Sequence, residues 1–420
     1  MSSTSTAAAE PRGTRVPILA LFAANAISMT GNVLTLIAIP WFVLETTGSA
    51  ALTGLVAFFT TLPAVIASFF GGAVVDRLGY RRMSVVSDIA SGASVAAIPL
   101  LHATIGLELW MLLALVFAGA LLDGPGSTAR SALVPDLAEM AGMSLERASG
   151  TSQAINRGAS LLGAPLAGLL IAFLGASNVL WIDAVSFAAS AVVVRLLVPL
   201  TGDAEERSPA GYLTELREGL SFIGRDRLIL AVVLTAMFTN FLDAPLFSVL
   251  LPIYATRVFG SALDLGLVIG AFGGAALISA VAFGAIGHRL PRRLTFGIAF
   301  VAAGLPFWVL AILPPLPIVI ACAVVTGLAG GPINPIISTA MYERVPPRLR
   351  GRVLGAVRSG AYVAIPAGVL VAGLLVEWIG LAGVLVAIAA SYLVVTLSIF
   401  LNPAMRGLER GTQPAPQPGG

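Results

Sequence analysis

The sequence contains very few of the residues that enzymes use for catalysis. Among its 420 residues there is no lysine, two are histidine, and Cys322 is the single cysteine. Without lysine the phosphate-binding motif Gly-x-x-x-x-Gly-Lys is absent, which excludes ATP-driven pumping through a P-loop of this chain. A single cysteine forms neither a disulfide nor a metal cluster within one chain. We therefore predict a protein that is not an enzyme and that holds no cofactor and no metal.

Charged residues are also scarce, at 11% of the chain, whereas an ordinary soluble domain has about 25%. Hydrophobic residues make up 57% of the chain, and the mean hydropathy is +0.95. Apolar surface on that scale requires a lipid bilayer around it. The net charge is +3, but the arginines lie in short loops between apolar runs. We attribute them to membrane topology and expect no binding of nucleic acid.

Twelve apolar runs are long enough to cross a bilayer, which takes about 20 residues in a helix. The predicted spans are 17–44, 50–74, 83–103, 107–131, 148–174, 177–199, 228–256, 262–286, 294–314, 316–341, 353–377 and 380–401. The first run follows Arg12 and Arg15, as in a signal peptide, but it continues without charge to Leu44. We interpret it as an uncleaved first span. The predicted fold class is an all-α polytopic membrane protein with 12 transmembrane helices.

The arginines indicate which loops face the cytoplasm, because cytoplasmic loops of membrane proteins are rich in basic residues. Nearly all of them lie in the two tails and in the loops after spans 2, 4, 6, 8 and 10. The loops on the other side contain one arginine, Arg257. Both termini are therefore predicted to be cytoplasmic. The abundance of Arg, Ala and Gly suggests a GC-rich bacterial genome, so we expect a multi-pass protein of the bacterial cytoplasmic (inner) membrane.

The spans and the charged stretches between them define five segments of the chain. Residues 201–227 form the one sizeable charged insert, and Leu216, Leu220 and Ile223 repeat there at helical spacing. This pattern predicts an amphipathic helix on the inner membrane surface. The predicted segments are a cytoplasmic tail at 1–16, a six-helix bundle at 17–200, a cytoplasmic linker at 201–227, a second six-helix bundle at 228–401 and a disordered tail at 402–420.

An internal repeat relates the two predicted bundles. Three stretches of the first half recur in the same order in the second, which indicates duplication of a six-span unit. The paired stretches are Gly72 to Arg82 with Gly284 to Arg293, Ser127 to Pro135 with Ser338 to Pro346, and Gly150 to Pro165 with Gly351 to Pro366. The fold is thus expected to be two six-helix pseudo-repeats.

These motifs resemble those of the major facilitator superfamily, which has a charged Gly-x-x-x-Asp-Arg-x-Gly-x-Arg-Arg loop between its second and third spans. Further stretches resemble the macrolide and enterobactin exporter branch of its drug:proton antiporters. They are Ser127 to Asp136, Trp181 to Phe187, Gly331 to Asn334 and Glu343 to Val353. The fifth span departs from the antiporter motif, because it has Pro165 but no Gly-Pro pair.

The charged loop is predicted to act as a conformational latch formed by Gly72, Asp76, Arg77, Gly79 and Arg81. Asp76 at the membrane boundary needs a partner, and a helix N-terminus offers about half a positive charge. In the resembled family this partner is helix 11, so the resemblance implies that the latch closes the cytoplasmic side. The alternative is that Asp76 only neutralises Arg77 or Arg81 in a solvated turn.

Two carboxylates inside the spans are candidates for proton coupling, because charged residues in a bilayer are costly and are usually functional. Asp123 lies in span 4 and Asp243 in span 7. In a low dielectric a carboxylate readily takes a proton and releases it when its surroundings change. For Asp123 the alternative is a structural ion pair with Arg130 or Arg157.

Other polar and aromatic residues within the spans are candidates for lining a substrate cavity. In the resembled fold, spans 1, 4, 7 and 10 surround the central cavity, and spans 5 and 11 reach it. The predicted cavity residues are Asn32, Asn156, Arg157, Asn240, Phe247 and Arg358. Arg157 and Arg358 are counterparts in the internal repeat.

Together these features predict a secondary active transporter that exports a lipophilic small molecule, drug-, macrolide- or siderophore-like, by alternating access. Its partners would be the substrate, protons and the lipid bilayer, and we expect a monomer. One alternative is a proton-coupled or facilitative importer on the same fold. Another is a membrane sensor or scaffold that transports nothing.

Overall fold

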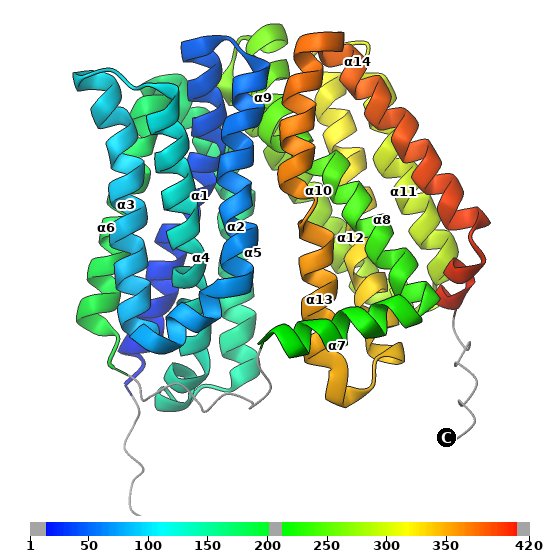
Figure 1. Cartoon of the computed structure of the whole chain (residues 1–420), viewed down its shortest axis with the longest axis horizontal. Helices are drawn as coiled ribbons and strands as arrows, with labels where there is room; N and C mark the ends of the chain where they lie inside the picture. The colour runs from blue at the N-terminus through cyan, green and yellow to red at the C-terminus, as the bar shows by residue number, and fades with distance from the viewer. Residues whose placement is uncertain (1–13, 201–211, 410–420) are drawn as a thin grey trace, which may run out of the picture.

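The computed structural model describes residues 14–200 and 212–409, and all regular secondary structure in these ranges is helical. Figure 1 shows two bundles of long helices side by side, one blue to green and one green to red. The first bundle contains α1 (Val16–Thr47), α2 (Ala50–Leu78), α3 (Tyr80–Thr104), α4 (Leu109–Met140), α5 (Leu145–Leu174) and α6 (Ala176–Leu197).

The second bundle begins with α8 (Arg227–Pro245), which continues through η1 (Leu246–Leu250), α9 (Leu251–Tyr254) and η2 (Ala255–Phe259) as one span. It goes on with α10 (Ala262–Ile286), η3 (Gly287–Arg289), α11 (Arg292–Leu310), α12 (Leu316–Arg344), η4 (Pro347–Leu349), α13 (Arg350–Tyr362), α14 (Ile365–Leu401) and η5 (Pro403–Leu408).

The helical segment made of α13 and α14 accounts for two crossings of the bilayer. Eleven helical segments of the described residues are long and apolar enough to span a membrane, and the last covers 50 residues, Arg352–Leu401. Gly380 within α14 has φ 75° and ψ 167°, a left-handed conformation that favours glycine. Figure 1 shows the chain rising in orange and descending in red on the two sides of this turn. The twelve-span, all-helical prediction is thereby confirmed.

Several helices extend further than the apolar runs from which they were predicted. The fourth span was expected to end at residue 131, but α4 continues to Met140 past the exposed side chains of Asp136 and Glu139. Hydropathy identifies only the part of a helix that lies in hydrocarbon, whereas backbone hydrogen bonding continues into water.

The eleventh span is interrupted between α13 and α14, just before Pro366, because proline cannot donate a helical hydrogen bond.

The predicted disordered tail at 402–420 is wrong for its first residues. Pro403–Leu408 forms the 3₁₀ helix η5, and both Met405 and Leu408 are 1% exposed. These apolar side chains pack at the ends of α8 and α11, which holds the start of the tail on the bundle. Residues 410–420 lie outside the described residues, as do 1–13 and 201–211.

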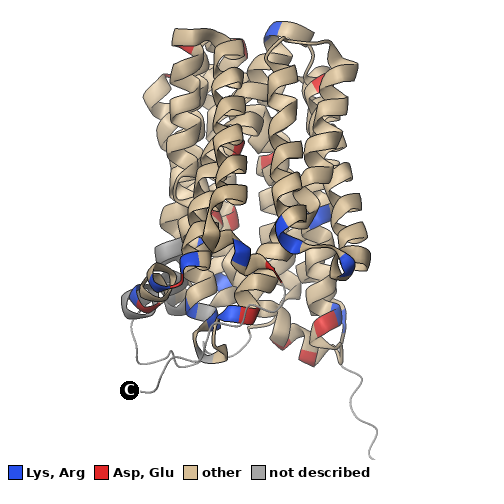
Figure 2. Cartoon of the chain, turned by 90° about the vertical axis from the view of Figure 1, so that its right-hand side faces the viewer, with Lys and Arg blue, Asp and Glu red and all other residues tan. Residues whose placement is uncertain are grey.

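The two ends of the molecule differ in their content of charged residues. Figure 2 shows the basic residues gathered toward the lower end of the molecule and few charges at the upper end. We call the end with Gly79 and α7 (Tyr212–Arg225) the arginine-rich end, and the end where α2 begins the arginine-poor end. Figure 1 shows α7 lying across the arginine-rich end. It is held on α13 by buried Ile223 and by an ion pair between Glu218 and Arg352.

The two bundles touch most closely near the arginine-poor end. There α2 packs on α14 and α5 packs on α10. A Cβ atom added to Gly54 would lie 2.8 Å from the Cα of Gly373, and one added to Gly168 would lie 2.9 Å from the Cα of Gly266. The backbones are therefore in contact at both helix pairs, as small residues allow in membranes.

Candidate functional site

A cavity of about 470 Å³ lies within the second bundle. Four of the predicted site residues converge on it, namely Asn240, Asp243, Phe247 and Arg358. Aromatic side chains from α10, α11, α13 and α14 complete much of the wall, and they are Phe272, Phe296, Phe300, Tyr362 and Tyr392. The wall of the cavity is therefore mainly apolar and aromatic, with hydroxyl, amide and two charged side chains among its residues. Small-molecule sites usually combine apolar walls with placed polar groups.

Asp243 is the one acidic side chain among the residues lining this cavity. Its carboxylate accepts a hydrogen bond from the phenol of Tyr392, which is 2% exposed on the second leg of α14. Arg358, the one cation of the wall, is exposed. A carboxylate with one neutral donor and aromatic neighbours is poorly compensated, so a positive group entering the cavity would be attracted to it.

Local irregularity in the seventh span shapes the cavity next to Asp243. Pro245 follows two residues later, and Leu246–Leu250 then forms the π-helical turn η1. Proline breaks the regular ladder, and single π-helical turns are frequent at functional sites. The ring of Phe247 in η1 lies 4.7 Å from that of Phe272, centroid to centroid. The sequence shows Pro245 but not the π-helical turn that follows it.

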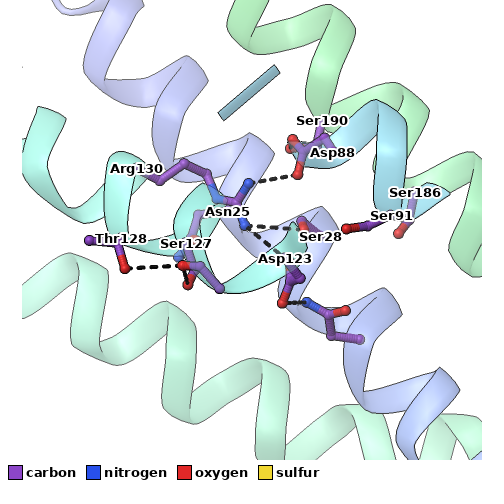
Figure 3. A network of polar contacts seen from close by, with 12 residues as sticks. Asn25, Ser28, Asp88, Ser91, Asp123, Ser127, Thr128, Arg130, Ser186 and Ser190 are labelled. Carbon is purple, nitrogen blue, oxygen red and sulfur yellow. Dashed lines mark hydrogen bonds and ion pairs between the residues drawn. The ribbon is translucent and has the colours of Figure 1, made fainter. Parts of the chain in front are cut away.

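The first bundle holds a buried network of charged and polar side chains (Figure 3). Arg130 of α4, which is 2% exposed, donates to Asp88 of α3 at 2.7 Å. Ser190 of α6 donates to the other oxygen of Asp88 at 2.7 Å, and Arg130 also reaches Ser28 of α1 at 3.4 Å. Four helices thus meet around one ion pair.

Asp123 lies at the edge of this network. Its carboxylate is 4.0 Å from Arg130 and accepts a hydrogen bond from Asn32 at 3.2 Å. Its side chain is 26% exposed, against 1% for that of Asp88. The alternative of a structural pair with Arg130 therefore applies more directly to Asp88, and Asp123 is the more accessible of the two carboxylates.

A second group of polar contacts lies along α1 and α6. Thr35 donates to Asp183 at 2.5 Å and Ser186 donates to the same side chain at 3.1 Å. Asp183 is fully buried. These contacts fix α6 on α1, which agrees with a structural role for Asp183.

The remaining predicted residues of the first bundle are separate from the cavity. Asn156 of α5 accepts a hydrogen bond from Asn25 of α1 at 3.0 Å, and Arg157 beside it is exposed. Neither lines the cavity of the second bundle. The predicted site residues therefore form two groups, one in each bundle.

The latch candidates lie where α2 meets α3. The helix α2 runs through Gly72, Asp76 and Arg77, and the side chains of Asp76 and Arg77 are outside those that the structure describes. Gly79 joins α2 to α3 with φ 79°, a conformation that requires glycine. The guanidinium of Arg81 donates to the backbone carbonyl of Arg195 at the end of α6. Arg81 thus contacts its own bundle here.

Sequence reasoning missed two partners that the fold supplies. Tyr392 lies 149 residues from Asp243, and Ser190 lies 102 residues from Asp88. No local motif joins either pair. Among residues 14–200 and 212–409, no group of three His, Cys, Asp or Glu side chains is placed to hold a metal ion.

Comparison with known families identifies the class of protein that this fold and cavity define. The sequence model of the Major Facilitator Superfamily matches residues 21–260 and 233–418. The chain therefore belongs to the major facilitator superfamily, a family of membrane transporters. It is not an enzyme.

Curated relatives cover almost the full length of the chain. The multidrug efflux pump Tap of Mycobacterium tuberculosis (strain ATCC 25618 / H37Rv) is 35% identical over 404 residues, covering 95% of this chain and 96% of the relative. Macrolide efflux protein A of Streptococcus pyogenes is 22% identical over 365 residues, covering 86% and 89%. Both relatives are named as efflux proteins.

Solved structures show the same fold at lower identity. The nucleoside transporter NupG has a TM-score of 0.75 with 15% identity, covering 91% of this chain and 98% of that one. A bacterial homologue of the lysosomal transporter Spinster has a TM-score of 0.71 with 13% identity, covering 97% and 100%. At these identities the likeness establishes the fold alone.

Proposed function

We propose that this protein is an efflux pump that exports lipophilic, drug-like molecules by alternating access, coupled to the entry of protons. The observation that carries the proposal is the aromatic cavity of the second bundle with Asp243 in its wall. Its volume of about 470 Å³ suits one small molecule. The full-length similarity to Tap, a multidrug efflux pump, supports export over import.

The cavity suggests which molecules bind. Tilted rings such as those of Phe247 and Phe272 favour planar apolar groups, and aromatic faces also attract cations. Asp243 adds a negative charge on ionisation and a hydrogen-bond donor on protonation. We therefore expect substrates with an apolar body and a basic nitrogen.

Proton coupling is supported by the charge balance of the first bundle. Asp88 and Asp123 share the single guanidinium of Arg130, so one negative charge remains when both carboxylates are ionised. Asp88 is held by Arg130 and Ser190, whereas Asp123 has Asn32 and partial exposure. We propose that Asp123 and Asp243 exchange the transported protons.

The orientation follows from the charge of the two ends. The arginine-rich end would face the cytoplasm of a bacterial cell, with both termini on that side. Cysteines introduced singly at Met140 and at Ile312, on the Cys322→Ala background, test this orientation. In intact cells a membrane-impermeant thiol reagent should label the cysteine at Ile312 and leave that at Met140 unmodified; the reverse pattern would overturn the orientation.

A transport assay in everted vesicles tests the proposal. Acidifying the vesicle interior should drive accumulation of the lipophilic cationic dye ethidium in vesicles that contain the pump. We expect Asp243→Asn to reduce this accumulation at least tenfold, because the cavity then lacks its one carboxylate. Asp123→Asn should remove its dependence on the pH gradient. Asp136→Asn, an exposed residue at the end of α4, is the matched control.

The alternatives predict different results in the same assay. An importer would release dye from acidified everted vesicles rather than accumulate it. A sensor or scaffold would give no accumulation, and Asp243→Asn would leave its cellular phenotype unchanged. If no compound of a broad toxic panel distinguishes cells with and without the protein, drug export is the wrong function.

A further inference from the structure

Glu377 links the two bundles at the arginine-poor end. It lies near the end of the first leg of α14, three residues before the turn at Gly380. Its carboxylate accepts a hydrogen bond from the hydroxyl of Ser49 at 2.9 Å and one from the backbone N–H of Ala51 at 3.2 Å. Both donors belong to the first bundle, so these bonds cross between the bundles.

The partner of Glu377 is the N-terminus of a long helix. Ser49 is the N-cap of α2, a helix of 29 residues, and its side chain also accepts from the N–H of Leu52. The first N–H groups of a helix have no partner within the helix, and they carry about half a positive charge together. A carboxylate placed there gains both hydrogen bonds and a favourable interaction with the helix dipole.

The contact of Glu377 lies next to the point where α2 and α14 pack most closely. One turn further along α2, a Cβ on Gly54 would meet the Cα of Gly373 at 2.8 Å. The backbones of α2 and α14 therefore touch just inside the contact of Glu377. If the bundles rock apart at the arginine-poor end, the packing of Gly54 on Gly373 and the hydrogen bonds of Glu377 both separate.

Two other acidic residues at this end bond within their own bundle. Glu45 accepts a hydrogen bond from the indole of Trp41, and Glu108 accepts one from the indole of Trp110. These contacts do not change when the bundles move as rigid bodies. The contact of Glu377 must break, because its donors and its carboxylate lie on different bundles.

We propose that Glu377 is a positioning residue of the transport cycle, a latch that holds the arginine-poor side closed and breaks when that side opens. The proposal rests on the alternating access of the proposed function, but on neither the substrate nor proton coupling. It complements the latch predicted for Asp76. Asp76 lies near the C-terminal end of α2, and its predicted partner is the start of span 11. Glu377 lies near the C-terminal end of span 11, and its partner is the start of α2.

This reciprocal arrangement predicts opposite conformational effects for substitutions that neutralise Glu377 and Asp76. The two acids lie at opposite ends of one helix pair, so each would stabilise a different conformation. Removing the charge of Glu377 should favour opening of the arginine-poor side, and removing the charge of Asp76 should favour opening of the arginine-rich side. A purely structural role would not produce opposite shifts.

Spin-label distances in the purified full-length protein measure the two conformations. A Cys322→Ala background removes the native cysteine. Labels at Thr104 and Ile312 report the arginine-poor side, and labels at Met140 and Pro347 report the arginine-rich side; all four residues are exposed. We expect Glu377→Gln to raise the ratio of molecules open on the arginine-poor side to those closed there about fivefold, as a helix-terminus charge contact implies.

Three variants complete the test. Glu108→Gln, at the same end, should leave both distance distributions as in the wild type. Asp76→Asn should shift them in the direction opposite to Glu377→Gln, and the double variant should return them toward the wild type. Unchanged distances in Glu377→Gln would overturn the latch, and a double variant identical to Glu377→Gln would overturn the reciprocity. These measurements need no transport, so loss of the drug-export proposal would be seen separately, in the dye assay.

Discussion

The two bundles are built alike, but their buried charged side chains have different partners. In the first bundle Arg130 is paired with Asp88 and surrounded by polar side chains from four helices. In the second bundle Asp243 has the neutral phenol of Tyr392 and borders a cavity. The first bundle pairs Asp88 closely with Arg130 and leaves Asp123 at 4.0 Å from the same guanidinium. Among its described residues, the second bundle has no cation paired with Asp243, which is left to be compensated by a group that enters the cavity.

We take this difference as support for separate roles of the two bundles in transport. A charge transferred from water into a protein interior is costly unless it is paired, so an unpaired one needs a function to retain it. The network around Arg130 joins α1, α3, α4 and α6, which stiffens the first bundle. The aromatic wall around Asp243 provides room and adaptable contacts. We therefore propose that the substrate contacts mainly the second bundle.

Arg130→Met is the strongest test of the first bundle's role. Removing one partner of a buried ion pair typically costs about 3–5 kcal/mol, because the other charge stays buried and unpaired. We therefore expect a large loss of thermal stability, measured by the unfolding of the detergent-solubilised protein. Arg358→Met, at the exposed cavity wall, is the matched control and should change stability little.

A second variant separates pairing from packing at Arg130. In Asp88→Asn/Arg130→Met both charges of the pair are removed together, so much of the lost stability should return. If the single and the double variant unfold at the same temperature, Arg130 stabilises the bundle by packing alone and the contrast between the bundles fails.

Tyr392→Phe tests the second bundle with a smaller change. It removes the hydroxyl that donates to Asp243 and keeps the ring in the cavity wall. A hydrogen bond to a charged group is worth about 1.5–3 kcal/mol, so we expect at least a tenfold change in the dye concentration that half-saturates export. Tyr362→Phe is the control, since Tyr362 lines the same cavity and is 50% exposed. Equal effects of the two variants would show that the bond to Asp243 does not matter.

Much of the scaffold was predictable from the sequence. Hydrophobic runs of the length of a bilayer, separated by arginine-bearing turns, identify spans with little ambiguity. Asn240, Phe247 and Arg358, which were predicted to line a substrate cavity, and Asp243, which was predicted to exchange protons, border one cavity in the structure. Their roles in transport stay predictions. Ionisable residues inside a span are rare, so each one is by itself a candidate functional residue.

The partners of these residues were not predictable. Tyr392 meets Asp243, and Ser190 meets Asp88, only because distant helices pack together. No local pattern indicated that Asn25 would donate a hydrogen bond to Asn156. Tertiary packing decides which polar groups satisfy each other, and a single sequence does not record it. The ordered turn at Met405 was missed for the same reason, because burial of two side chains outweighs the composition of the tail.

The smallest expected effect comes from one arginine in each bundle. Arg81, in the first turn of α3, donates to the carbonyl of Arg195 near the end of α6. Arg293, in the first turn of α11, donates to the carbonyl of Phe400 near the end of α14. Cations at helix C-termini bind otherwise unsatisfied carbonyls, and each such contact is worth about 0.3–1 kcal/mol.

Arg81→Gln and Arg293→Gln should therefore lower the thermal stability by similar small amounts if both arginines serve only as caps. Arg81 also belongs to the predicted latch, and Arg293 belongs to the copy in which His288 replaces the acid. We expect Arg81→Gln, in addition, to shift the spin-label distance at the arginine-rich end toward the open form, and Arg293→Gln to leave it unchanged. Identical distances in the two variants would assign Arg81 to capping alone and would restrict the latch to Asp76 and its neighbours.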